Sequence, residues 1–357
     1  MDEGWKFGGL ALAFASGTAL GAGLTRAGMP PSAITLFPEV PFVFLACLLL
    51  FLILLLNKRG TVPYVLLCLA FAAAGASGGA IASATVGTSS PAIVTRAGTV
   101  FRSHIDRLPF NEAGPLVKAF LSGDRSGLSS QTVKAFRSSG ASHLLALSGM
   151  HLGIIYLIVS KAGTVLGNSP VSRKSRSLSA IVLSGIFTLV TGASPSITRA
   201  FLFILLRETA IMTGRSRSGA GLLSGALTIQ LVIMPEAILS VGFQMSYAAV
   251  AGIVLLNGPL SGLYPGKGPI KRIWDAAVLA ISCQATTAPI AWLYFHTFPR
   301  YFLITNLMAI PLTTALMTVS IVAVILSAAG LHPPLLFHAA DFLARILISV
   351  LETVSSM

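Results

Sequence analysis

Long apolar stretches separated by short polar or basic turns repeat along the 357 residues of the chain. A helix of about 20 apolar residues spans the hydrocarbon core of a bilayer, and no stretch shows the two-residue alternation of a transmembrane strand. The pattern therefore predicts an all-α polytopic integral membrane protein with about 11 transmembrane helices, in a range of roughly 9 to 12. The expected spans are residues 7–25, 40–56, 62–84, 141–160, 178–192, 197–212, 219–234, 237–257, 276–298, 301–329 and 335–354.

Residues 92–110 show a different pattern, because charged and hydroxyl side chains stand between apolar residues that recur at helical spacing. This arrangement predicts an amphipathic helix lying in the outer membrane interface. Prolines and polar residues interrupt the apolar pattern at 194–196, 235–246 and 306–311. These interruptions favour broken or re-entrant helices at the three places.

The charge distribution predicts an orientation for the chain. Only 10% of the residues are charged and 54% are hydrophobic, with a mean hydropathy of +0.85 and a net charge of +13. Short basic loops at 58–59, 173–176, 215–217 and 267–272 fall on one side of the expected helices, which the positive-inside rule makes cytoplasmic. The N-terminus is then cytoplasmic and the C-terminus extracytoplasmic, in a plasma membrane. Residues 87–140 lie outside with seven basic and three acidic residues, a net of +4, which suits a polyanionic partner.

The residues that usually hold metals and nucleotides are missing or poorly spaced. The three cysteines are scattered in apolar runs, at Cys47, Cys68 and Cys283, without the spacing of metal ligands. No glycine-rich loop ends in Gly-Lys-Ser or Gly-Lys-Thr, so no ATPase site is expected. We therefore expect neither a metal nor a cofactor, and a protein that is not an enzyme.

Five segments, in order along the chain, resemble those of one protein family. Residues 121–129 read LSGDRSGLS, residues 136–153 read FRSSGASHLLALSGMHLG, and residues 194–200 read SPSITRA. Residues 241–247 read VGFQMSY, and the segment 284–311 ends in TNLMAIP. This series resembles the ComEC-type competence proteins, which pass DNA across the plasma membrane during natural transformation.

The resemblance implies a channel for single-stranded DNA. Residues 1–91 would form an N-terminal three-span segment, and residues 92–357 the competence-type channel domain. The family's OB-like and metallo-β-lactamase-like domains are not expected here, because only residues 86–91 separate the third span from the amphipathic helix and no His-x-His-x-Asp-His cluster occurs. The implied partners are single-stranded DNA, plasma membrane lipid, an outer DNA receptor, a separate nuclease or OB-like protein, and a cytoplasmic helicase-like motor.

Arginines are the first candidates for contact with DNA. Arg199 lies inside an apolar helix, where a cation is costly, so we expect a phosphate contact in the pore rather than an arginine that snorkels to the interface or caps carbonyl groups. Arg125 and Arg137 are candidates for receiving DNA at the outer mouth. The alternative for Asp124 and Arg125 is that they pair with each other in a turn, with Ser129 capping the next helix.

His143, Ser148 and His151 are polar residues of an expected span. The histidines are eight residues apart, which places them about 80° apart around one helix and does not suit a metal pair. Interior histidines are the favoured interpretation, with pore-lining donors as the alternative. Ser148 has no base other than its helical neighbour, so acyl chemistry is not expected.

Neutral polar side chains complete the candidate set: Gln244, Ser246, Tyr247, Gln284 and Asn306. They can line a path along which a strand slides, or they can hydrogen-bond one helix to another. A secondary transporter of a small anionic solute is the main alternative function, because broken helices are typical of that class. An intramembrane enzyme is the third hypothesis, and it lacks a convergent nucleophile and base.

Overall fold

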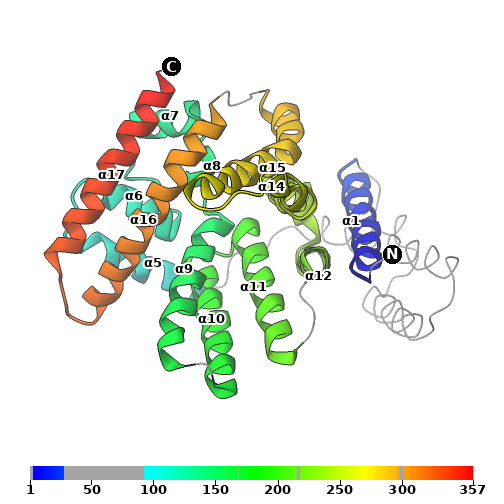
Figure 1. Cartoon of the computed structure of the whole chain (residues 1–357), viewed down its shortest axis with the longest axis horizontal. Coiled ribbons are helices and arrows are strands. Elements are labelled where there is room, and N and C mark those ends of the chain that lie inside the picture. The colour runs from blue at the N-terminus through cyan, green and yellow to red at the C-terminus, as the bar shows by residue number, and fades with distance from the viewer. Residues whose placement is uncertain (1–2, 28–91, 168, 215–217, 297–300, 357) are drawn as a thin grey trace, which may run out of the picture.

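A computed structural model describes residues 3–27, 92–167, 169–214, 218–296 and 301–356 (Figure 1). Every regular element in these residues is helical. The spans expected at 40–56 and 62–84 lie outside the described residues. The elements are α1 (Glu3–Arg26), α5 (Ala92–Asp106), α6 (Gly114–Ser122), α7 (Ser130–Ser138), α8 (Ser142–Leu145), α9 (Gly149–Ala162), η1 (Gly163–Leu166), α10 (Pro170–Val190), α11 (Pro195–Thr213), α12 (Gly219–Ile233), η2 (Pro235–Leu239), α13 (Val241–Gly252), the π-turn η3 (Ile253–Asn257), α14 (Gly258–Gly262), α15 (Pro269–Phe295), α16 (Phe302–Ala328) and α17 (Pro334–Ser355).

The described helices confirm an all-helical, membrane-embedded protein. Four segments are long and apolar enough to cross a bilayer, namely Val241–Gly262, Pro269–Phe295, Phe302–Ala328 and Pro334–Ser355. Shorter apolar helical stretches occupy Ala11–Ala22, Gly149–Ala162 and Gly219–Ile233. The total of about 11 spans stays a prediction.

The single helix expected over 141–160 is wrong, because the chain breaks there into α8 and α9. Ala146 is extended, with φ −74° and ψ 133°, and ends α8. Ser148 is also extended, and its side chain and backbone contact His151 at the start of α9. A polar side chain that bonds locally to the backbone competes with a continuous helix, which explains the break.

The interruptions expected further along the chain are partly found. The break near Pro235 falls on η2, and residues 241–252, with their polar side chains, are regular helix. The break expected at 306–311 is wrong, because α16 continues through Pro311. A proline removes one backbone hydrogen bond, and a helix inside a membrane protein tolerates this loss where neighbouring helices pack on it, as α15 and α17 pack on α16.

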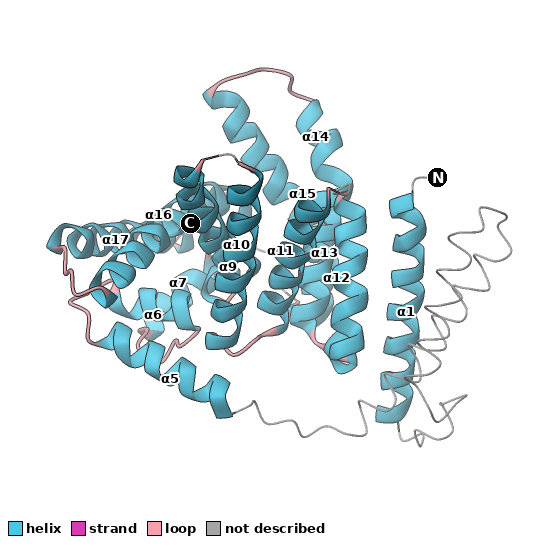
Figure 2. Ribbon diagram, turned by 90° about the horizontal axis from the view of Figure 1, so that it is seen from below, coloured by secondary structure: helices cyan, strands magenta, loops and turns pink. Residues whose placement is uncertain are grey.

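The helices pack around three apolar clusters. Helices α16 and α17 lie side by side. Helices α6, α7 and α9 pack against them, while α5 packs on α6 and α8 on α6 and α7. Helices α9, α10 and α11 form a neighbouring group (Figure 1). The α5 helix and the loop between α14 and α15 lie at opposite ends of the described structure (Figure 2). Representative buried residues of the clusters are Leu116, Phe120, Phe136, Leu316 and Leu347; Leu152, Phe187 and Ile197; and Phe14, Leu231 and Phe243.

A buried carboxylate links α17 to the segment that precedes α6. Asp341 of α17 is 5% exposed and accepts hydrogen bonds from the backbone N–H of Asn111 at 3.1 Å and of Ala113 at 2.9 Å. The Asn111 side-chain amide donates to the same carboxylate at 3.2 Å. Three donors satisfy the buried charge and fix the entry into α6 against α17.

Candidate functional site

A tight turn places the start of α11. Ala193 has a positive φ of 51°, and its N–H donates to the carbonyl of Thr188 at 2.9 Å. Its own carbonyl accepts from the Thr198 hydroxyl at 3.0 Å. Pro195 then occupies the first helical turn, where its missing N–H costs nothing. The turn therefore fixes the direction of α11, one helical turn before Arg199.

Arg199 is buried inside the helix bundle, with 6% of its surface exposed. The carbon at the centre of its guanidinium lies 5.6 Å from the ring centroid of Tyr247 in α13, which is a cation–π distance. Its Nη1 is buried and has no hydrogen-bond partner in the described part of the chain. The residue therefore neither reaches an exposed surface nor caps a described carbonyl with Nη1, as the two alternatives to a phosphate contact would require.

A chain of hydrogen bonds holds Tyr247 in place. The Tyr247 hydroxyl donates to Oε1 of Gln230 in α12 at 2.9 Å, and Nε2 of Gln230 donates to the carbonyl of Pro195 at 3.0 Å. Gln230 is fully buried. The ring under the guanidinium is thus bound to the same turn that directs α11, so α11, α12 and α13 form one rigid support.

The start of α9 contacts Arg199. A Cβ added to Gly149 would lie 3.4 Å from Nη2 of Arg199 and 3.2 Å from Cβ of Ala200. Gly153, one turn further on, has nothing within 4 Å of the same position. The bare backbone of Gly149 therefore allows the N-terminus of α9 and the guanidinium to approach each other.

Ser148 and His151 form a cap on α9. Nδ1 of His151 accepts from the backbone N–H of Ser148 at 3.1 Å and lies 2.9 Å from the Ser148 hydroxyl. Because Nδ1 accepts, the ring proton of the neutral histidine is assigned to Nε2. Nε2 is buried without a described partner, so no described group orients the ring for nucleophilic chemistry. The geometry is that of a helix cap, and it places His151 inside the protein, against Phe120.

The loop after α6 is held by Lys118 and not by an ion pair between Asp124 and Arg125. Nζ of Lys118 lies 2.9 Å from Oδ1 of Asp106 and 3.5 Å from Oδ2 of Asp124. Oδ1 of Asp124 accepts from the N–H of Ser126 at 3.0 Å. The alternative in which Asp124 pairs with Arg125 is therefore wrong, because the turn directs this carboxylate to a backbone donor and to Lys118.

The contacts of this loop stabilise the charged forms of Asp124 and Lys118. The hydrogen bond from Ser126 lowers the pKa of the Asp124 carboxyl. The hydrogen bond with Asp106 raises the pKa of Lys118. Ser129 caps α7 as expected, accepting from the N–H of Thr132 at 3.0 Å.

Three of the expected DNA contacts are exposed on this side of the protein. Arg125, Arg137 and His143 all have exposed side chains. Neither arginine forms an ion pair with any residue that the structure describes. Both cations are therefore open to a partner, and both belong to the α6–α8 layer rather than to the surroundings of Arg199.

The neutral polar residues divide between bonded and unbonded groups. Nε2 of Gln244 donates to the carbonyl of Ile238, and the hydroxyls of Ser246 and Ser196 lie 3.4 Å apart. Oδ1 of Asn306 is buried and has no described partner. Gln284 is half-buried in α15. Helix cross-linking thus accounts for Ser246 and Tyr247, and Gln244 bonds only to nearby backbone, within its own segment.

Sequence reasoning missed two buried groups. Gln230 is one, although it is the only amide in an apolar helix. The other is Glu208, 4% exposed, which accepts a hydrogen bond from the Tyr156 hydroxyl at 2.5 Å. Arg207 donates to the same hydroxyl at 2.9 Å. A lone carboxylate in an apolar span was the available signal for Glu208.

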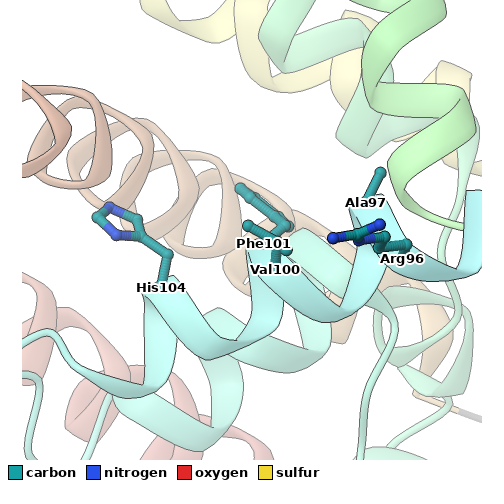
Figure 3. A pocket seen from close by; sticks show the side chains of 5 residues that line it. All are labelled: Arg96, Ala97, Val100, Phe101 and His104. Atoms are coloured by element: carbon teal, nitrogen blue, oxygen red, sulfur yellow. The ribbon is translucent and has the colours of Figure 1, made fainter. Parts of the chain in front are cut away.

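An open groove of about 570 Å³ runs along α5. Figure 3 shows that its lining comes from this one helix: Arg96, Ala97, Val100, Phe101 and His104. The apolar middle and the arginine at one end agree with an amphipathic helix. None of the expected DNA contacts lines this groove.

The comparison with known families matches most of this architecture. Residues 120–357 match the model of the competence protein family, so the match includes α7 to α17 and the surroundings of Arg199. The chain belongs to the competence protein family. No solved structure matches it.

Three curated relatives share low identity, between 25% and 28%, with this competence-family chain. ComE operon protein 3 of Bacillus subtilis is 25% identical over 212 residues, which are 58% of this chain and 25% of that protein. The uncharacterized protein YcaI of Escherichia coli is 25% identical over 197 residues, 54% of this chain and 26% of that protein. Competence protein ComA of Neisseria gonorrhoeae is 28% identical over 174 residues, 46% of this chain and 25% of that protein. The matched part is about a quarter of each relative's length.

Proposed function

We propose that this protein passes single-stranded DNA across the bacterial plasma membrane during natural transformation. Its membership of the competence family supports a role in DNA uptake, and the described helices supply the membrane-embedded body. The proposed orientation places the N-terminus in the cytoplasm and α5 to α8 on the outer side.

The observation that carries the proposal is the buried, unpaired guanidinium of Arg199. A cation inside a membrane protein costs free energy unless an anion or a polar group compensates it. No carboxylate of the described residues pairs with Arg199, and Nη1 has no acceptor. A passing phosphate backbone supplies the missing anion.

Arg125 and Arg137 would act before Arg199. Both are exposed and unpaired among the described residues, on the layer that the orientation places outside. Such cations raise the local concentration of a polyanion at the entrance. DNA collected there would then move inward toward Arg199, the one arginine that is buried in the described part of the chain.

The translocation needs partners that supply energy and single strands. The sequence contains no nucleotide-binding loop, so we propose a cytoplasmic helicase-like motor as the source of work. An outer DNA receptor would deliver the duplex. A separate nuclease or OB-like protein would prepare the strand that enters.

The test is DNA uptake in a transformable host in which the gene for this chain is replaced by variants. Arg199→Gln keeps a polar side chain of similar length and removes the charge. We expect about a tenfold or larger loss of internalised labelled DNA, with duplex bound at the cell surface unchanged. Arg272→Gln, which removes an exposed arginine at the start of α15, is the matched control and should leave uptake unchanged.

Two outcomes would oppose the proposal. Normal DNA uptake by Arg199→Gln, at normal protein level, would remove the buried arginine from the mechanism. Proteoliposomes that accumulate labelled inorganic phosphate, together with DNA uptake that is independent of the whole chain, would support a secondary transporter of small anions instead.

A further inference from the structure

We propose that Arg199 and the N-terminus of α9 together form a seat for one phosphate group of the strand. This inference rests on the proposed function and specifies where the strand is held. Two independent features meet at this point: a helix start with free N–H groups and a guanidinium that lacks an anion.

The first feature is the N-terminus of α9, a helix of 14 residues. The first N–H groups of a helix have no acceptor within it, and the helix dipole adds about half a positive charge there. The N–H of His151 bonds to the carbonyl of Ser148, whereas those of Gly149 and Met150 have no backbone acceptor among the described residues. The helix start therefore offers two donors to an anion.

The second feature is the guanidinium of Arg199, which is 94% buried and aimed at the same helix start. Nη2 lies 3.4 Å from the position that a Cβ of Gly149 would occupy, and Nη1 has no described partner. Two positive groups face each other without an anion between them. Such an arrangement is unfavourable in a low-dielectric interior unless an anion occupies it for part of the cycle.

A phosphate suits both features. A guanidinium presents parallel N–H donors that match two phosphate oxygens, and helix N-termini bind the same group through backbone N–H. Tyr247 packs against the guanidinium at 5.6 Å, and its hydroxyl is held by Gln230. These two are positioning residues, which keep the fork of Arg199 directed at α9.

The missing side chain of Gly149 leaves the space that a phosphate oxygen would occupy in this seat. A methyl group there would crowd Cβ of Ala200 at 3.2 Å and stand in front of Nη2. An oxygen could then no longer reach both the guanidinium and the α9 amides. Gly153 offers a matched control, since a methyl group there meets nothing within 4 Å and leaves the helix start unchanged.

A single seat fits a strand that must keep moving. One arginine and two amides hold one phosphate, so each nucleotide step exchanges one phosphate for the next. A row of such seats would bind the strand more tightly and slow its release.

The test measures binding of a fluorescent twelve-residue oligothymidylate to the purified full chain in nanodiscs of zwitterionic lipid. Arg199→Gln should weaken binding about tenfold and lower the slope of log affinity against log salt concentration by about 0.7. Arg199→Lys should restore the slope but only part of the affinity, because the fork is lost. Gly149→Ala should weaken binding, and Gly153→Ala should not.

The same oligomer with a neutral methylphosphonate backbone is the key comparison. It should bind wild type and Arg199→Gln equally, because it lacks the charge that the seat recognises. Variants are compared only where their thermal unfolding matches that of wild type. If Arg199→Gln does not fold, Arg199→Lys is measured in its place, and the expected result is then a lower affinity with an unchanged salt slope; an unchanged affinity would overturn the seat.

Three results would overturn the seat. The first is an unchanged affinity and salt slope in Arg199→Gln for the phosphodiester oligomer. The second is an equal loss of affinity for the oligomer in Gly149→Ala and Gly153→Ala. The third is displacement of the oligomer from wild type by nanodiscs containing phosphatidylglycerol, which would assign the arginine to a lipid headgroup. If binding is unchanged while uptake in cells falls, the seat fails and the proposed function stands; if uptake is also unchanged, both fail.

Discussion

The guanidinium of Arg199 in α11 stacks on the ring of Tyr247 in α13, with 5.6 Å between the guanidinium carbon and the ring centroid. The ring in turn bonds through its hydroxyl to Gln230 of α12. One cation therefore depends on two neighbouring helices for its position.

Tyr247→Phe should destabilise the protein by about 1–3 kcal/mol while keeping the ring under Arg199, because the buried Oε1 of Gln230 loses its donor. Gln230→Leu should cost a similar amount, and the double variant should cost less than the sum. Thermal unfolding of purified protein in detergent measures all three. If the destabilisation of the double variant equals the sum of the two single destabilisations within about 0.3 kcal/mol, the two side chains are not coupled.

Ala193→Gly should stabilise the protein by about 1 kcal/mol, because Ala193 adopts a φ of 51° that only glycine takes without strain. Gly192, its neighbour, has a φ of 83°, so Gly192→Ala should destabilise the same turn. The melting temperature in detergent reports both changes. A lower melting temperature for Ala193→Gly would mean that the methyl group has a packing role that outweighs the strain.

Gly252→Ala should damage the packing of α13 against α15. A Cβ at Gly252 would overlap the carbonyl oxygen of Ser282 and come within 2.5 Å of Oγ1 of Thr286. The helices must separate to admit it, at a cost of about 1–3 kcal/mol or more. Gly242→Ala, on the same helix but with nothing within 4 Å, is the control. Equal membrane levels and equal melting temperatures for the two variants would contradict the close approach.

Asp124→Asn should weaken the loop between α6 and α7 at neutral pH but not in acid. The folded carboxyl has a pKa below its ordinary value of 3.8, so the charged form stabilises the fold above that value. This contribution begins to be lost as the pH falls below 3.8 and is gone once the pH is below the lowered pKa of the folded carboxyl, where wild type and Asp124→Asn should converge. At pH 7 the difference should be on the order of 1 kcal/mol, since the partly exposed ion pair with Lys118 is lost and the Ser126 N–H then bonds to a neutral amide oxygen instead of a carboxylate.

Thermal unfolding of both proteins at pH 7 and near pH 3 measures this convergence. Glu112→Gln is the control, because Glu112 forms an exposed pair with Arg345 at 3.7 Å and such pairs contribute little. A difference between wild type and Asp124→Asn that does not decrease between pH 7 and pH 3 would contradict the assignment.

Apolar length predicted most helices correctly, and local polarity predicted their breaks less well. The runs that became α15, α16 and α17 are long enough for length alone to decide. The break at Ser148 depends on a serine and a histidine that bond to the backbone, and the continuity at Pro311 depends on neighbouring helices. A sequence pattern records neither of these local and tertiary contacts.

The candidate site was predictable in its main residue and not in its surroundings. Arg199 stands out as a cation close to the start of an apolar helix. Its contacts, Gly149, Tyr247 and Gln230, lie on three other helices, and only the tertiary fold brings them together. Asp124 was assigned the wrong alternative partner for the same reason, since Lys118 approaches it from the preceding helix.

The hydrogen bonds to Asp341 can form only late in the synthesis of the chain. Asn111 is made 230 residues before the carboxylate that satisfies its N–H. At about 5–20 residues per second, a ribosome needs roughly 10 to 50 s to cover that distance. During this time the nascent entry to α6 has no permanent acceptor, so the segment from α6 to α8, which carries Arg125 and Arg137, reaches its final form only after α17 has been made.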